Sequence, residues 1–317
     1  MLRSLGHRVT IETEYRGAAC DLLVALHARR SFPSIERFHR DHPERPLILA
    51  LTGTDLYGDL RTDADARRAL DLASHLILLQ PAGLDELPAR IRAKARVVYQ
   101  SASPAPGRSA PSRRTFDVCV IGHLRPVKDP FRAAEAVRLL PGQSRARVVH
   151  IGAALSPEMR RAARAEAARN PRYRWLGDLP RWKTLRVLAH SRLMVLSSLA
   201  EGGANVISEA IVAGIPVLAS RIPGSIGLLG PGYPGYFRPG DTRGLKDRLW
   251  RAETDPVFYG TLKRWCTRLA PTFDPARERE SWKRLLRDAV EGRPRSAAAG
   301  QAIRPLRLTP VAVSAGV

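Results

Sequence analysis

The sequence predicts an α/β protein with two doubly wound domains, each built around a parallel sheet. Short apolar runs rich in Val, Ile and Leu alternate with segments of helical periodicity along most of the chain, which is typical of βαβ units. One Ser-, Pro- and Arg-rich stretch interrupts this alternation near the middle. The chain has 317 residues, which is enough for two domains that each bury a core.

The first domain is predicted to span residues 1–100. Its strand candidates are the apolar runs at 9–13, 22–26, 47–51, 76–79 and 97–100. Its helix candidates, which show a spacing of three to four residues between apolar positions, are 34–40, 64–73 and 84–93. Residues 101–115 (SASPAPGRSAPSRRT) have too little apolar surface to order by themselves, and they predict a linker.

The alternation resumes in a second domain over 116–274. Its strand candidates are 116–121, 148–151, 173–176, 193–196 and 217–219, and its helix candidates are 130–140, 157–169, 181–190, 205–213, 245–253 and 256–269. A further helix at 275–290 carries Trp282 and is expected to brace the domains. Residues 291–317 are rich in Ala, Arg and Pro without periodicity, and we expect disorder there.

Composition narrows the function classes. The net charge is +22, which raises nucleic acid or an anionic membrane as partners, but no zinc-finger spacing or stacking motif accompanies the Arg residues. A solvated, Arg-rich surface is the favoured interpretation, and a positive field that attracts an anionic substrate is the alternative. No run of 18 apolar residues and no signal-peptide pattern is present, and the three cysteines are far apart, which favours a reduced cytoplasmic protein.

The segment SSLAEGGANVISEAIVAGIPVLAS (197–220) is the strongest candidate for a ligand site. It leads from a strand through Gly202 and Gly203 into an apolar helix, and open parallel sheets bind ligands beyond the carboxyl ends of their strands. Two glycines let a backbone approach a ligand closely, and free N–H groups near Ala204 and Asn205 would face an anion. The pattern predicts a diphosphate site.

Glu201 and Glu209 flank this turn at a spacing of eight residues. Glu209 would lie about one turn into the helix, where a carboxylate can accept hydrogen bonds from ribose hydroxyls. Glu201 would lie at the mouth of the site. The alternative is that both acids only satisfy the helix dipole, although two acids around a Gly-Gly turn favour the functional interpretation.

A second basic loop, GHLRPVKDP (122–130), follows the first strand of the second domain. Arg125 and Lys128 could neutralise the charge on a departing diphosphate without a metal, and His123 adds a donor. A solvated basic loop that Asp129 caps is the alternative. We expect no metal and no cofactor.

Polar residues also follow two strands of the first domain. His27 follows one strand, and Thr54 and Asp55 follow the next, so these side chains form the predicted acceptor side. Asp55 could position an acceptor or could cap the following turn.

These segments together resemble the retaining glycosyltransferases of family 4, which have the GT-B fold of two Rossmann-like domains. The resemblance rests on the context EGGANVISEA around Glu201 and Glu209. It implies that Glu201 contacts the transferred sugar and Glu209 the ribose, that the Gly-Gly turn holds the phosphates and that Lys128 neutralises the leaving group without a metal. Gly177, in WLGDLP (175–180), matches the place where the family receives the base.

A narrower resemblance is carried by TGTDLYGDL (52–60), IGHLRPVKDP (121–130) and SRIPGSIGLLGPGYPGYF (220–237). These segments are similar to the selenosugar synthases of selenoneine biosynthesis. That similarity implies transfer from a UDP-sugar, UDP-N-acetylglucosamine in particular, to selenophosphate. A saccharide or lipid acceptor and a nucleotide-sugar-binding protein without activity are the alternatives.

Three departures from the family pattern are visible. His123 stands where the family usually has Arg, and Arg125 is the candidate replacement. Thr52 stands before Gly53, where the family often has His. The sequence begins with LRSLGHRVTIE, which matches the end of a helix and the second strand, so the first strand and its glycine-rich loop are expected to be missing.

Overall fold

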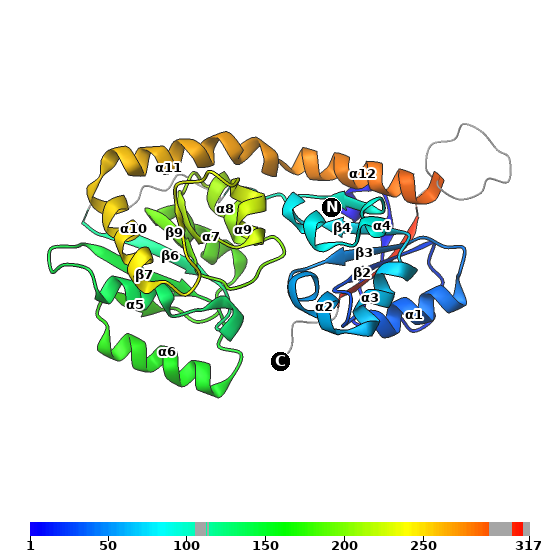
Figure 1. The fold of residues 1–317 in the computed structure, drawn as a ribbon, viewed down its shortest axis with the longest axis horizontal. Helices are drawn as coiled ribbons and strands as arrows, with labels where there is room; N and C mark the ends of the chain where they lie inside the picture. Colours follow the sequence, from blue (N-terminus) through cyan, green and yellow to red (C-terminus); the bar gives the residue numbers. More distant parts are fainter. Residues whose placement is uncertain (105–111, 113, 292–305, 313–317) are drawn as a thin grey trace. The chain divides into compact units, whose positions relative to one another are not determined.

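The computed structural model describes residues 1–104, 112, 114–291 and 306–312. These residues divide into two compact units (Figure 1). The first unit contains residues 1–100, 201–203 and the described residues from 275 onward, and the second contains 101–200 and 204–274. Each unit has one six-stranded sheet whose strand pairs are all parallel, so the predicted α/β class with two doubly wound domains is confirmed.

The sheet of the first unit has the order β1-β12-β2-β3-β4-β5. Its strands are β1 (Arg8–Val9), β2 (Leu22–Leu26), β3 (Leu47–Leu51), β4 (His75–Leu78), β5 (Ala95–Val97) and β12 (Arg307–Ala312). The central strands are continuous apolar runs because helices cover both faces of the sheet.

The strand β12 comes from the end of the chain and lies between β1 and β2 (Figure 1, red). Leu308 is opposite Leu22 in this register, and Leu308 and Thr309 are almost fully buried. The expectation of disorder over 291–317 is therefore wrong for Arg307–Ala312, while 292–305 and 313–317 lie outside the described residues.

Two core clusters lie on the two faces of this sheet. On one face, α1 (Phe32–Asp41) and α3 (Ala64–Leu72) cover alternate strand residues such as Leu23 and Leu49. On the other face, α12 (Pro275–Glu291) packs Leu285 and Leu286 against the remaining strand residues and Leu308. The shorter elements are η1 (Leu2–Leu5), η2 (Asp55–Asp59), α2 (Leu60–Thr62), η3 (Pro81–Glu86) and α4 (Ala89–Arg92).

The sheet of the second unit has the order β11-β10-β9-β6-β7-β8. Its strands are β6 (Phe116–Ile121), β7 (Ala146–Ile151), β8 (Tyr173–Trp175), β9 (Leu193–Leu196), β10 (Val217–Ser220) and β11 (Tyr236–Phe237). The chain crosses from β8 at one edge back to β9 beside β6. The strand order reverses between β6 and β9, and ligands bind at such a reversal in open α/β sheets.

The direction of each crossover decides which face its helix covers. The helices α5 (Arg132–Arg138) and α6 (Pro157–Arg169) follow β6 and β7, so they lie on one face. The helices α7 (Arg181–His190) and α8 (Asn205–Val212) belong to crossovers in the opposite direction and lie on the other face. The remaining elements are η4 (Pro126–Lys128), α9 (Pro223–Leu229), α10 (Thr242–Thr254), α11 (Pro256–Leu269) and η5 (Ala270–Phe273).

Among the described residues, no helix has both the length and the apolar content needed to cross a bilayer.

Candidate functional site

The loops that follow the neighbouring strands β6 and β9 are tied together. Ser197 Oγ donates hydrogen bonds to the carbonyl oxygens of Lys128 and Asp129, at 3.2 and 2.9 Å. The backbone N–H of Leu199 donates to the carbonyl of Val127 at 2.8 Å. These bonds hold the basic loop 122–130 beside the carboxyl end of β9, although the two loops are about 70 residues apart in sequence.

His123 and Lys128 line one small pocket at this edge, together with Gly122, Ser197 and Ser198. His123 Nδ1 accepts a hydrogen bond from the N–H of Ala153 at 3.0 Å. In the neutral imidazole, the proton must therefore reside on Nε2, which is left as a donor. An ammonium and a ring N–H around one pocket form a suitable site for a phosphate oxygen. Arg125 is not among the residues that line this pocket.

The loops after β6, β7 and β8 are joined through Gly152. Its N–H donates to the carbonyl of Gly177 at 2.8 Å, and its carbonyl accepts from Trp175 Nε1 at 2.9 Å. A Cβ on Gly152 would clash with the backbone of Gly122, so only glycine fits at this crossing. The predicted base-binding residue Gly177 has φ +70°, the left-handed conformation that favours glycine.

A buried histidine also holds the turn at Gly122, which Gly152 approaches closely. His150 Nε2 donates to the carbonyl of Gly122 at 3.1 Å, which leaves Nδ1 to accept from the Tyr173 hydroxyl at 3.0 Å. Burial lowers the pKa of His150 to about 4, so the ring is neutral at physiological pH. The turn that carries His123 is thereby fixed to the sheet.

The helix α8 begins at Asn205 after Ala204, whose side chain cannot cap it, and among the described residues no side chain is bonded to the N–H groups of Asn205 and Val206. Glu209 lies in the second turn of this helix and is 6% exposed. Its Oε1 pairs with Arg181 Nη1 at 2.8 Å and accepts from Asn205 Nδ2 at 3.4 Å. A carboxylate has more acceptor sites than these two contacts use, so Glu209 can also accept a hydrogen bond from a ligand hydroxyl.

Two opposing effects act on the Glu209 carboxyl group. Burial raises its pKa, and the Arg181 guanidinium opposes that rise. The ion pair with Arg181 therefore favours the ionised form, which is the better hydrogen-bond acceptor.

Residues 201–203 cluster with the first unit rather than the second. A Cβ on Gly202 would meet the backbone of Thr52, and a Cβ on Gly203 would meet the side chain of Leu79. Phosphate approach is the predicted role of these glycines, but close packing within the first unit already requires both of them. Glu201 is 9% exposed, and its place at one site with Glu209 stays a prediction.

The predicted acceptor residues of the first unit form a polar cluster. His27 Nε2 lies 3.0 Å from Thr54 Oγ1 and 3.6 Å from Asp59 Oδ2. His27 has φ +74°, which is uncommon for a residue with a side chain, and residues 55–59 form a π-helical turn. Both features are enriched at functional sites. Burial is the largest influence on His27 and lowers the pKa of its imidazole.

Asp55 caps its own turn and does not present a carboxylate to an acceptor. Its Oδ1 accepts from the N–H groups of Thr52, Gly53 and Leu56, and its Oδ2 accepts from the N–H of Ala28. The side chain is fully buried. These bonds support the turn-capping alternative for Asp55, which fixes the loops that carry His27 and Thr54.

The structure thus brings together His123 and Lys128 and places Gly177 beside Gly152. It places Asn205, Ala204 and Glu209 at the start of α8, and His27 and Thr54 in a separate cluster in the first unit. Sequence reasoning missed Gly152, His150, Ser197 and Arg181. Gly152 directly follows a predicted strand, so its position was a usable signal, whereas the pairing of Arg181 with Glu209 depends on tertiary structure.

Comparison with known protein families identifies the family of this chain. The profile described as "Glycosyl transferases group 1" matches residues 107–265. The chain belongs to this family. The match covers the loops around His123, Gly177 and Glu209 in this group 1 glycosyl transferase. No curated protein matches the chain in sequence.

Solved structures support the fold of this glycosyl transferase. Alr3699/HepE of Anabaena, in complex with UDP and glucose, has a TM-score of 0.68 at 20% identity, covering 84% of this chain and 77% of its own. A sucrose-phosphate synthase of Thermosynechococcus elongatus has a TM-score of 0.69 at 15% identity, covering 86% and 74%. An α,α-trehalose-phosphate synthase (UDP-forming) of Burkholderia vietnamiensis has a TM-score of 0.70 at 15% identity, covering 86% and 74%. These similarities confirm the expected GT-B fold.

Proposed function

We propose that this glycosyl transferase moves a sugar from a UDP-sugar to a small anionic acceptor, with retention at the anomeric carbon and without a metal. The observation that carries the proposal is the uncapped start of α8, with the buried carboxylate of Glu209 one turn further along the helix. Alr3699/HepE of Anabaena is described in complexes with UDP and with UDP-glucose, which supports a uridine nucleotide as the donor.

In this proposal, each donor fragment has a matching protein group. The N–H groups at Asn205 and Val206 and the positive end of the α8 dipole bind the diphosphate. Glu209 Oε2 accepts hydrogen bonds from the ribose hydroxyls, while Arg181 keeps the carboxyl group ionised. The backbone around Gly177 receives the base.

The leaving group is stabilised by the basic loop. As the bond between the anomeric carbon and the β-phosphate oxygen breaks, UDP leaves with the electron pair, and Lys128 neutralises the added negative charge. His123 Nε2–H donates to a phosphate oxygen. Arg125 supplies a guanidinium at the rim in place of the Arg that His123 replaces. Glu201 contacts the transferred sugar.

The finer proposal names UDP-N-acetylglucosamine as donor and selenophosphate as acceptor. Selenium forms the new bond to the anomeric carbon on the face that UDP leaves, which gives a selenosugar phosphate and UDP. The net charge of +22 draws both anionic substrates toward the protein. His27 and Thr54 are the acceptor-side residues in this scheme.

The test incubates the purified full chain with UDP-N-acetylglucosamine and selenophosphate, and it identifies products by mass spectrometry. A selenosugar product that is lost in Glu209→Gln and kept in Glu158→Gln, an exposed control on α6, supports the proposal. A saccharide or lipid glycoside formed only when those acceptors are supplied would replace selenophosphate as acceptor. UDP binding with no turnover of any acceptor would favour a nucleotide-sugar-binding protein, and tight, salt-dependent DNA binding without UDP binding would overturn the proposal.

A further inference from the structure

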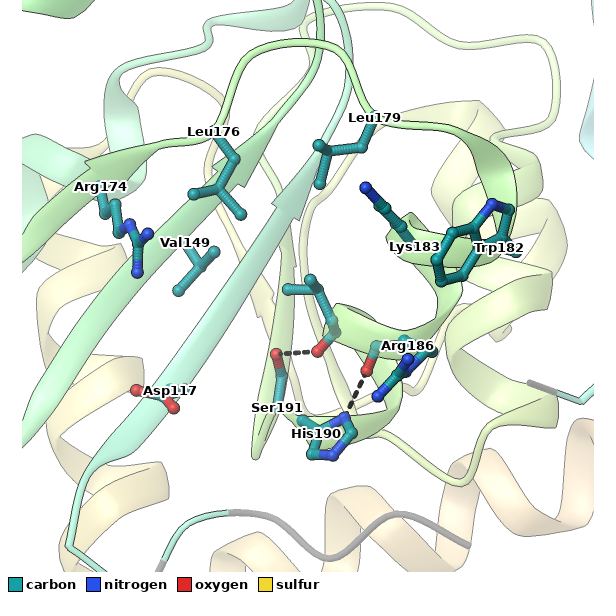
Figure 2. Close-up of a pocket in the computed structure, with 11 residues that line it drawn as sticks. Asp117, Val149, Arg174, Leu176, Leu179, Trp182, Lys183, Arg186, His190 and Ser191 are labelled. Atoms are coloured by element: carbon teal, nitrogen blue, oxygen red, sulfur yellow. Dashed lines mark hydrogen bonds between the residues drawn. The ribbon is translucent and has the colours of Figure 1, made fainter. Parts of the chain in front are cut away.

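A second, larger pocket lies in the second unit on the face of the sheet that carries α7 (Figure 2). It has a volume of about 460 Å³ and lies between α7 and the strands β7 and β8. Its apolar wall is made of Val149, Leu176, Leu179 and Val187. This volume falls in the range of small-molecule sites, which are lined mainly by apolar side chains with a few polar groups.

The pocket is open because α7 covers only part of this face. The helix packs against β6, whereas Val149 on β7 and the neighbouring Arg174 on β8 are not fully covered. Apolar surface left half-exposed at the edge of a sheet contributes stability once a ligand covers it.

Three cations surround this apolar wall. Arg174 comes from β8, and Lys183 and Arg186 come from α7 (Figure 2). Among the residues that the structure describes, none of the three cations forms an ion pair. Asp117 is the acidic group that lines the pocket, and Figure 2 shows it at the end away from Lys183 and Leu179. The rim therefore carries net positive charge beside an apolar surface.

An exposed aromatic side chain adds to the apolar surface at the mouth. Trp182 is 52% exposed, and the Lys183 ammonium lies 5.3 Å from the centre of its ring. The indole supplies a large apolar contact surface, and the neighbouring ammonium places a positive charge beside it.

The pocket shares no residue with the small pocket that His123 and Lys128 line, and Glu209 is not among its lining residues. It extends along α7 from Trp182 to Ser191 and reaches Asp117 near the amino end of β6.

We propose that this pocket, named here the α7 pocket, binds an anionic amphiphile, a molecule with an aliphatic or aromatic body and a carboxylate, sulfonate or phosphate head. The body covers Val149, Leu176 and Val187, and the head pairs with Lys183, Arg186 or Arg174. This inference is independent of the proposed transferase activity.

The test uses 8-anilinonaphthalene-1-sulfonate as a fluorescent probe, titrated into the full chain, with dodecyl phosphate below its aggregation limit as competitor. The α7 pocket predicts saturable binding of one probe and displacement by dodecyl phosphate. The double variant Lys183→Glu/Arg186→Glu weakens probe binding by about tenfold or more, since it removes two charge-assisted contacts. The control Arg164→Glu makes the same kind of charge change on an exposed position of α6 and leaves the affinity unchanged.

Further arms separate the possible sources of signal. Saturating UDP leaves probe binding unchanged if the α7 pocket is the site, and displacement by UDP would overturn the proposal. Equal probe affinity in the wild type and the double variant would also overturn it, and circular dichroism checks that both are folded. Binding to phosphatidylglycerol vesicles without binding of monomeric dodecyl phosphate would assign this surface to a membrane and reject a small-molecule site.

Discussion

The guanidinium Nη1 of Arg181 lies 2.8 Å from Oε1 of Glu209, and this pair joins the start of α7 to α8. The Arg181 side chain is largely exposed, whereas the Glu209 side chain is 6% exposed. The exposed partner therefore contributes little to stability by itself. Its effect is on the charge state of the buried carboxyl group, which is the group that recognises the donor in the proposed mechanism.

Replacing Arg181 with Met should shift the acidic limb of the kcat/KM profile for the UDP-sugar to higher pH. Burial already raises the pKa of Glu209 above 4.5, and loss of the opposing cation raises it further. The profile is measured from pH 4.5 to 8, with Arg164→Met on α6 as the matched control. An acidic limb at the same pH in Arg181→Met and in the wild type would show that ionised Glu209 does not limit the reaction.

His150 predicts a loss of stability in mild acid. Its pKa is about 4 in the native state against 6.5 for the ordinary imidazole, so the unfolded chain binds the proton more readily. The contribution of neutral His150 to the free energy of unfolding is therefore fully present above pH 6.5. It is lost as the pH falls toward 4, and the loss is on the order of 3 kcal/mol. Urea unfolding of the wild type and of His150→Gln between pH 7 and 4 measures the difference, and this part of the pH dependence should vanish in the variant.

The matched control for that measurement is His39→Gln, which changes an exposed histidine on α1. Its stability should follow the wild-type pH dependence. If His150→Gln did the same, the buried neutral state of His150 would be refuted.

Gly152→Ala should destabilise the second unit and weaken UDP binding together. The added Cβ would clash with the backbone of Gly122, and the φ of +152° is unfavourable for alanine. Overpacking of this kind costs about 1–3 kcal/mol. Gly142→Ala is the control, because a Cβ there meets nothing within 4 Å. Equal stability and equal UDP affinity for the two variants would show that Gly152 and Gly122 do not approach each other closely.

Leu308→Ala tests whether β12 is a structural strand of the first unit. Leu308 is 1% exposed and packs with Leu22, Val24 and Ile48, so its truncation should cost about 2–5 kcal/mol. Arg307→Ala, at the exposed neighbouring position, is the control, and urea unfolding is the measurement. A stability loss no larger than in the control would mean that β12 does not pair in solution.

The sequence predicted most of the strands because both faces of each sheet are covered, which produces continuous apolar runs. The run at 47–51 was predicted with the bounds that β3 has, and the run at 22–26 with those of β2. The strand at 307–312 was missed, since the C-terminal segment that contains it lacks periodicity. Its apolar residues become buried only when the strand lies between β1 and β2. Pairing over such a sequence distance is invisible to a local pattern.

The same limit applies to the site. The positions of Glu209, Lys128 and His123 after strands could be read from the sequence, because ends of parallel strands meet at one edge. The role of Asp55 could not be predicted, since acceptor positioning and turn capping both fit the residue. The hydrogen bonds that it accepts from Ala28 and Gly53 are visible only in the structure. Arg181 and His150 act through partners distant in sequence, which only the fold brings near.

The central claim is that the start of α8 and the basic loop after β6 bind a uridine diphosphate. Isothermal titration calorimetry of UDP into the wild type, Glu209→Gln, Lys128→Ala and the exposed control Glu158→Gln tests it most directly. We predict that the wild type and the control bind UDP alike, and that the other two variants lose about tenfold or more in affinity. No detectable UDP binding by the wild type, or equal affinity in all four proteins, would contradict the claim.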